Sequence, residues 1–166
     1  MNKIITFLAV LGIFSLQSCT VNDNTPIVDN DTISEVFEVT TSFNSTNNYS
    51  KLVALNPSIY SSDVVLVYRL SGTYQGRDVW KLLPETHYFN DGTIDFGYNF
   101  DFTRNDVNIY LIGNNLQTVS DQYRVNQVLR IVIVPGAFSA DLKTSNYADV
   151  MARLNINESQ IQSVRF

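Results

Sequence analysis

Two stretches of the sequence, VVLVYRL at 64–70 and VLRIVIV at 128–134, carry apolar residues on both alternating faces. Because successive side chains of a β-strand point to opposite sides, a strand of this composition must be covered on both of them. The chain is also rich in aromatic residues that favour strands, with 9 Tyr and 10 Phe. We therefore expect both stretches to be central strands of a layered β-structure.

A third stretch, Thr93–Phe102, alternates between apolar and polar or small residues. The apolar positions are Ile94, Phe96, Tyr98, Phe100 and Phe102, and the intervening ones are Asp95, Gly97, Asn99 and Asp101. This pattern predicts a strand with one buried and one solvated face. Turn signals such as Asn90-Asp91-Gly92 separate further stretches with strand character. These additional strands are expected over residues 36–43, 50–55, 78–83, 107–112 and 160–166.

The period changes near the end of the chain. Tyr147, Val150, Met151 and Leu154 are spaced as i, i+3, i+4 and i+7, which predicts a helix of two to three turns. Ser145 or Asn146 is available as its N-cap. The expected fold is therefore mainly β: an antiparallel β-sandwich, Ig-like or jelly-roll-like, with one short C-terminal α-helix.

The first 18 residues have the anatomy of a signal peptide, with a positive end at Lys3 and an apolar stretch from Ile4 to Leu16. That stretch is shorter than the roughly 20 residues that cross a bilayer as a helix, so we expect it to be removed. Residues 19–34 are polar and rich in Asn and Asp, which predicts a flexible tether. The β-sandwich domain is expected over residues 35–166.

Leu16-Gln17-Ser18-Cys19 resembles the lipobox of bacterial lipoproteins, whose Cys is acylated and becomes the new N-terminus. Cys19 is the only cysteine, so a disulfide within the chain is excluded. The alternative is a secreted protein with one free thiol, which is a liability in an oxidising compartment. Two or more acyl chains, such as palmitate, would attach the protein stably to a membrane, and the outer membrane is the expected location. Asp31-Thr32-Ile33 resembles an O-glycosylation motif of Bacteroidetes envelope proteins, which makes Thr32 a candidate modification site.

Four phrases of the mature chain are similar to a family of small cell-envelope lipoproteins from flavobacteria and their relatives in the Bacteroidetes. These phrases cover residues 62–70, 78–84, 98–107 and 127–135. The resemblance implies a lipid-anchored envelope domain. The family has no assigned activity, so the resemblance implies no catalytic residue, ligand or cofactor.

Residues with catalytic or metal-binding chemistry are sparse. His87 is the sole histidine and no cysteine accompanies it in the domain, so a His/Cys zinc site lacks ligands. No Gly-x-Ser-x-Gly elbow is present to serve a triad, and His87 is expected to be structural. Four aspartates between positions 91 and 106 do not have the spacing of a calcium loop. We expect no catalytic residue, metal or cofactor. A net charge of −5 also disfavours nucleic acid as a partner.

Aromatic residues are the remaining functional lead. Tyr74, Trp80 and Tyr88 fall in or near one predicted hairpin and are candidates to stack on sugar rings, although aromatics of a small β-domain mostly fill its core. We expect a non-catalytic binding or structural module, attached to the membrane by its lipid, that docks an envelope protein or a glycan. The alternative is a small enzyme, such as a glycan hydrolase, acting on an envelope or extracellular polymer.

Overall fold

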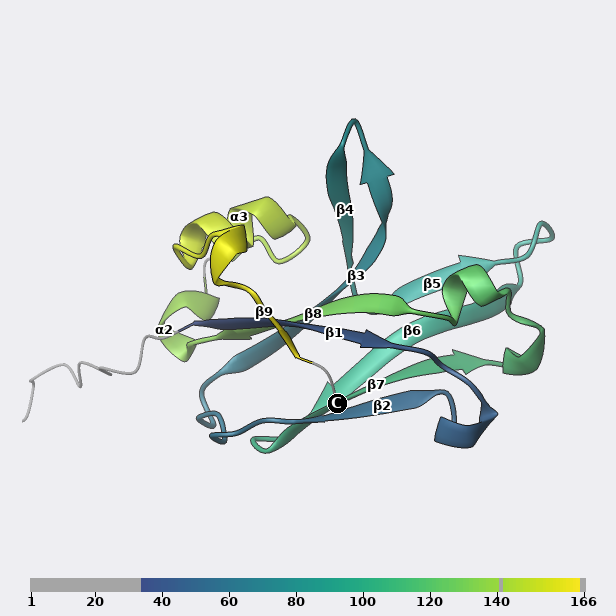
Figure 1. Cartoon of the computed structure of the whole chain (residues 1–166), viewed down its shortest axis with the longest axis horizontal. Coiled ribbons are helices and arrows are strands. Elements are labelled where there is room, and N and C mark those ends of the chain that lie inside the picture. Colours follow the sequence, from purple (N-terminus) through teal and green to yellow (C-terminus); the bar gives the residue numbers. More distant parts are fainter. Residues whose placement is uncertain (1–33, 141, 165–166) are drawn as a thin grey trace, which may run out of the picture. The chain divides into compact units, whose positions relative to one another are not determined.

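The strands lie in two sheets packed face to face, with short helices on one outer side (Figure 1). This is a computed structural model, and it describes residues 34–140 and 142–164. The chain divides into two units, Met1–Asn30 and Asp31–Phe166, and all described residues belong to the second.

A five-stranded sheet has the order β4-β3-β8-β1-β9, and a four-stranded sheet has the order β2-β7-β6-β5. The strands are β1 (Glu35–Thr41), β2 (Ser50–Ala54), β3 (Val64–Tyr74), β4 (Arg77–Leu82), β5 (Glu85–Tyr88), β6 (Ile94–Phe102), β7 (Asp106–Gly113), β8 (Gln127–Val134) and β9 (Gln162–Val164). All neighbouring strands pair antiparallel except β1 and β9, which are parallel. The mainly antiparallel β-sandwich expected from the sequence is confirmed.

Short helices connect or cover the strands. They are the 3₁₀-helices η1 (Ser45–Asn47), η2 (Leu116–Thr118), η3 (Asp121–Tyr123) and η4 (Glu158–Gln160) and the α-helices α2 (Gly136–Ser139) and α3 (Tyr147–Arg153). The helix α3 lies within the span that the sequence predicts, and the Asn146 side chain caps it by accepting hydrogen bonds from the backbone of Ala148 and Asp149. The strand β9 follows α3 in the chain and forms an edge of the five-stranded sheet.

Two hydrophobic clusters explain why β3 and β8 are apolar on both faces. The inner cluster lies between the sheets and includes Val65, Val67, Leu129, Ile131 and Ile133. The outer cluster includes Leu66, Tyr68, Val132 and Val134, packed against Val150, Met151 and Leu154. The segment around α3 therefore covers the outer face of the five-stranded sheet, as a strand without a polar face requires.

Two details depart from the expected strand pattern. The strand β5 has no counterpart among the predicted strands: Pro84 ends β4, but the chain then crosses to the other sheet and pairs at once with β6. On β6, Phe96 and Tyr98 are buried, whereas Ile94 and Phe102 at its two ends are exposed. The expectation of one wholly buried face is wrong at these ends, because β6 extends beyond the residues that cover its middle.

Candidate functional site

The structure separates the three aromatic residues that the sequence proposes for sugar stacking. Trp80 is half-buried on β4 and packs against α3. Tyr74, 68% exposed, lies at the end of β3, where it pairs with Arg77. Tyr74 is not among the residues that line the cleft beside Trp80, which is described next. Tyr88, 62% exposed, lies on β5 of the other sheet. Of the three, Trp80 is the one that lines this candidate site.

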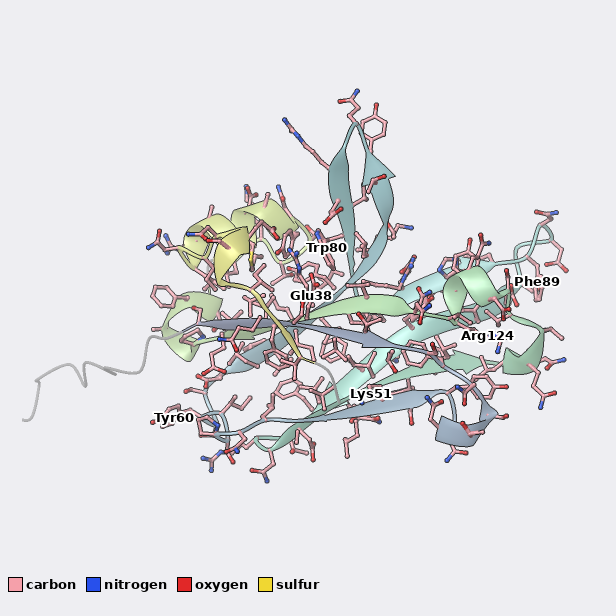
Figure 2. All side chains as sticks on the ribbon, in the orientation of Figure 1. Glu38, Lys51, Tyr60, Trp80, Phe89 and Arg124 are labelled. Carbon is pink, nitrogen blue, oxygen red and sulfur yellow. The ribbon has the colours of Figure 1, made fainter. Side chains whose placement is uncertain are left out.

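That site is a cleft of about 680 Å³ between the β3–β4 hairpin, α3 and the segment leading into η4. Figure 1 shows the hairpin standing beside α3, and Figure 2 places Trp80 near the base of the hairpin on this side. The cleft is lined by Gly76, Arg77, Asp78, Trp80, Tyr147, Ala148, Met151, Ala152, Ile156, Asn157 and Glu158. Its volume falls within the range of small-molecule sites, and its walls combine an aromatic pair with a polar rim.

Arg130, on the outer face of β8, holds the walls of this cleft together. Its Nε lies 2.7 Å from Glu38 Oε2 on β1, and its Nη2 lies 2.7 Å from Glu158 Oε2 on η4. Its guanidinium carbon is 4.0 Å from the centre of the Trp80 ring and 5.3 Å from that of Tyr147, and its Nη1 donates to the Tyr147 hydroxyl. One buried cation thus fixes residues from four elements.

The contacts of Arg130 also set its ionisation. Burial alone would lower the pKa of Arg130, but hydrogen bonds to Glu158 and Glu38 raise it above its ordinary value. Burial raises the pKa of the Tyr147 hydroxyl to about 12, against the opposing effect of Arg130. At neutral pH the cleft therefore presents a charged guanidinium and a protonated phenol, neither of which is suited to exchange protons with a substrate.

The rim of the cleft carries two charged side chains that are available to a ligand. Within the described part of the chain, the carboxylate of Asp78 and the guanidinium of Arg77 make no hydrogen bond or ion pair. Both residues are exposed at the start of β4. Glu158, in contrast, already pairs with Arg130. The cleft can therefore offer a free acceptor and a free donor next to its aromatic wall.

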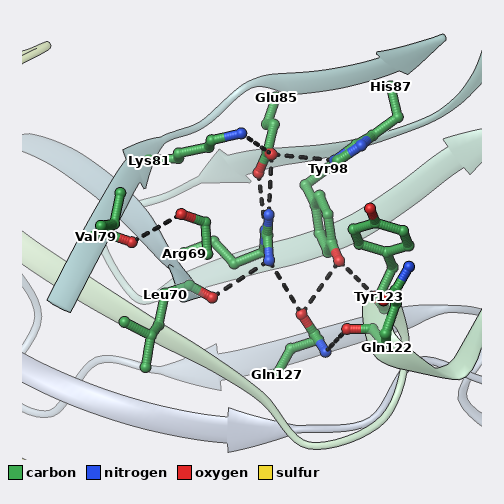
Figure 3. Close-up of polar contacts among 11 residues, drawn as sticks. Arg69, Leu70, Val79, Lys81, Glu85, His87, Tyr98, Gln122, Tyr123 and Gln127 are labelled. Atoms are coloured by element: carbon green, nitrogen blue, oxygen red, sulfur yellow. Dashed lines mark hydrogen bonds and ion pairs between the residues drawn. The ribbon is translucent and has the colours of Figure 1, made fainter. Parts of the chain in front are cut away.

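A second arginine cluster lies inside the sandwich, at its β3–β5 side (Figure 3). Arg69 is 4% exposed and binds the Glu85 carboxylate with two hydrogen bonds, of 2.8 Å from Nε and 2.9 Å from Nη2. Its Nη1 donates to Leu70 O and to Gln127 Oε1. The Lys81 Nζ lies 3.2 Å from Glu85 Oε1. Because Arg69 is on one sheet and Glu85 on the other, this pair ties the two sheets together.

Aromatic rings surround this pair. The Tyr98 ring lies under the Arg69 guanidinium, with 4.7 Å from its centre to the guanidinium carbon, and the Tyr98 hydroxyl bonds to the Tyr123 carbonyl. The His87 ring stacks on Phe96 at 4.4 Å, and its Nε2 lies 3.0 Å from Glu85 Oε1 without hydrogen-bond alignment. Arg69 also borders a cleft of about 370 Å³ with Tyr123 and Gln127, but its guanidinium is already bound by Glu85 and other protein groups. We regard the Arg69 cluster as structural and the Trp80 cleft as the candidate functional site.

Acid should weaken the Arg69 cluster. Burial lowers the pKa of His87 below its ordinary 6.5, with Arg69 and Lys81 opposing and Glu85 favouring its protonation. Burial alone would raise the pKa of Glu85, but the hydrogen bond from Arg69 lowers it below its ordinary 4.5. Each group therefore has a lower pKa in the folded protein than in the unfolded chain. At a pH between these two values the unfolded chain binds more protons than the folded protein. The stability that each group contributes is therefore complete above its unfolded pKa and is lost as the pH falls toward its folded pKa.

We therefore expect the free energy of unfolding to decline first below about pH 6.5, through His87, and again below about pH 4.5, through Glu85. Urea denaturation from about pH 4 to about pH 8 would measure this. The variant His87→Gln should lose the first decline and keep the second. An identical pH dependence in the variant and the wild type would contradict this assignment.

Sequence reasoning identifies Trp80 but misses Arg69 and Arg130. A signal was available, because each is a lone charged residue within a stretch that is otherwise apolar. Such an arginine is rarely fully buried without a partner, so it points to a carboxylate nearby. The partners Glu85 and Glu38 could not be inferred, because they lie on other strands.

Cys19 and Thr32 lie outside the described residues. Over residues 34–140 and 142–164, no helix is long and apolar enough to cross a membrane. The same residues contain no group of three or more His, Cys, Asp or Glu placed to hold a metal ion. Comparison of the whole chain with family models, curated proteins and solved structures found no match.

Proposed function

We propose that this protein is a lipid-anchored module of the cell envelope that binds a ligand and does not transform it. The observation that carries the binding role is the cleft between the β3–β4 hairpin and α3, with its aromatic pair and its unpaired Asp78 and Arg77. A preformed concave site with a few converging polar groups is the usual form of a ligand site. The partner would be an envelope protein or a glycan.

The chemistry of the cleft supports binding more than catalysis. A glycan hydrolase needs two carboxyl groups, one of which is a proton donor. Of the carboxylates that line the cleft, Glu158 is already paired with Arg130 through contacts of 2.7 Å and 2.8 Å. His87 does not line the cleft, and its Nε2 is buried beside Glu85. The small-enzyme alternative therefore lacks a second free carboxyl group here.

Support for the anchor comes from the sequence. Leu16-Gln17-Ser18-Cys19 follows an apolar stretch that is too short to span a bilayer, and Cys19 is the only thiol of the chain. A polar segment of about 15 residues separates Cys19 from β1 and would let the domain stand away from the membrane surface.

Replacing Cys19 with alanine should release the protein from the membrane. The thiol is the proposed attachment point, and no helix over residues 34–140 and 142–164 is long and apolar enough to cross a membrane. Cell fractionation and incorporation of labelled palmitate would test this in Cys19→Ala, with Thr20→Ala as the matched control. The control should stay in the membrane fraction and keep its label. Unchanged retention and labelling of Cys19→Ala would rule out the proposed anchor.

A further inference from the structure

We propose that the cleft beside Trp80 binds a neutral carbohydrate, whose ring stacks on the aromatic wall while its hydroxyl groups bind Asp78 and Arg77. This inference rests on the proposed binding function and names the ligand class of that same site. It is carried by three features of the cleft: its aromatic wall, its free polar groups and its charge balance.

The aromatic wall is rigid before any ligand arrives. The Trp80 and Tyr147 rings lie 5.5 Å apart at an angle of 35°, and Arg130 contacts both of them. Tyr147 also packs edge-on against the buried Tyr68, whose hydroxyl donates to the Thr144 carbonyl at 2.6 Å. A sugar ring presents a face of C–H groups that packs on such aromatic surface. Little conformational entropy would be lost on binding, because these side chains are already fixed.

The free polar groups suit hydroxyls. A sugar hydroxyl both donates and accepts, so it can donate to the Asp78 carboxylate and accept from the Arg77 guanidinium. Hydrogen bonds to charged groups are stronger than those between neutral ones. A purely apolar ligand in the same place would desolvate Asp78 and Arg77 without giving them partners, which is costly.

The charges around the cleft favour a neutral ligand. Arg77 and Arg130 are balanced by Asp78 and Glu158, so these groups sum to no net charge. The chain as a whole carries −5. A polyanionic glycan or a phosphorylated ligand would therefore gain nothing from the site and would be repelled by the protein around it.

Arg130 is a positioning residue in this arrangement. It does not line the cleft, but it contacts Trp80, Tyr147 and Glu158, which do. The variant Arg130→Met should weaken sugar binding while leaving Asp78 and Arg77 in place. Binding at wild-type strength by a folded Arg130→Met protein would show that Arg130 has no such role.

The chain itself provides a direct probe of occupancy. Trp80 is its only tryptophan and lines the cleft, so emission excited beyond the absorption of the nine tyrosines reports on this site alone. We would titrate the full-length protein in detergent with neutral and with uronic-acid oligosaccharides and follow the emission of Trp80. The expected result is a saturable change with a neutral oligosaccharide and no saturable change with the acidic ones.

Two exposed residues of the same hairpin provide the test and its control. Asp78→Ala removes the proposed acceptor and should weaken binding about ten-fold or more. Tyr74→Ala removes an exposed aromatic that does not line the cleft and should leave the affinity unchanged. Equal effects of the two variants, or saturation only with acidic sugars, would overturn the inference.

The remaining outcomes separate this inference from the proposed function. Trp80 fluorescence that responds to a peptide but to no sugar, and that loses this response in Asp78→Ala, would overturn the carbohydrate assignment and retain the binding role. Chromatographic detection of cleavage of the bound oligosaccharide would support carbohydrate as the ligand and overturn the non-catalytic function.

Discussion

Replacing Glu85 with alanine is expected to lower the free energy of unfolding by about 3–5 kcal/mol. Glu85 is 9% exposed, and its carboxylate accepts two hydrogen bonds from Arg69, which is also buried. Without the carboxylate, the Arg69 guanidinium would remain inside the sandwich with only the backbone oxygen of Leu70 and the side-chain amide oxygen of Gln127 as hydrogen-bond acceptors. An uncompensated buried charge costs far more than the pair itself contributes. Equilibrium denaturation in urea would measure the loss.

An exposed ion pair provides the control. Arg124 and Asp121 lie 2.8 Å apart, but the Asp121 side chain is 78% exposed. Asp121→Ala should therefore change stability by about 0–1 kcal/mol. A Glu85→Ala loss no larger than that of Asp121→Ala would show that Arg69 reaches solvent in the variant and that the pair does not join the sheets.

A double variant separates the cost of an orphaned charge from the worth of the pair. Arg69→Met combined with Glu85→Leu removes both charges and fills the space with apolar groups. Replacing a buried pair in this way is often neutral, so the double variant should be more stable than Glu85→Ala alone. A double variant that is less stable than Glu85→Ala would mean that the ion pair stabilises the fold in its own right.

The two arginine clusters differ in the surroundings of their partners. The Glu85 side chain is 8% exposed, whereas those of Glu38 and Glu158 are 23% and 64% exposed. If Arg130 is removed, both glutamates can be hydrated where they are, so little charge is left buried. We therefore expect Arg130→Met to fold, so that its effect on ligand binding in the cleft can be measured. The Arg69 cluster, in contrast, stabilises the sandwich.

Local pattern was enough to predict most strands, and it failed where the chain changes sheets. The strand β8, Gln127–Val134, contains the whole of the stretch 128–134 that the sequence predicts to be a strand, because a run of apolar residues ending before Pro135 is a local signal. The strand β5 was missed because Glu85–Tyr88 is short and follows a proline, and its pairing with β6 is what makes it a strand. The exposure of Ile94 and Phe102 at the ends of β6 likewise depends on which other segments pack against them, and the local sequence does not show this.

The candidate site was only partly predictable for the same reason. Trp80 could be chosen by residue type, but so could Tyr74 and Tyr88, which do not line the cleft. The cleft arises because β4 passes beside α3, and because Arg130 binds Glu38, which is 92 positions away in sequence. Such contacts follow from tertiary packing and leave no periodic trace in the sequence.

Replacing a leucine with alanine should lower stability strongly on the outer face of the five-stranded sheet and hardly at all on the outer face of the four-stranded sheet. Leu66→Ala is expected to cost about 2–5 kcal/mol, because Leu66 is buried in the outer cluster beneath the segment around α3. Ile131→Ala, on the inner face of the same sheet, should cost a similar amount. Leu52 lies on β2 of the other sheet, pairs with Asn108 and is 61% exposed. Leu52→Ala should therefore change stability by no more than about 0.5 kcal/mol.

These three variants test the layered arrangement that positions the cleft. Large losses from both Leu66→Ala and Ile131→Ala mean that the five-stranded sheet is covered on its two faces, which is the condition that its apolar strands impose. A Leu66→Ala protein as stable as Leu52→Ala would mean that α3 does not pack on this sheet in solution. Tyr147 would then have no fixed position opposite Trp80, and the aromatic wall of the cleft would not be formed in advance of a ligand.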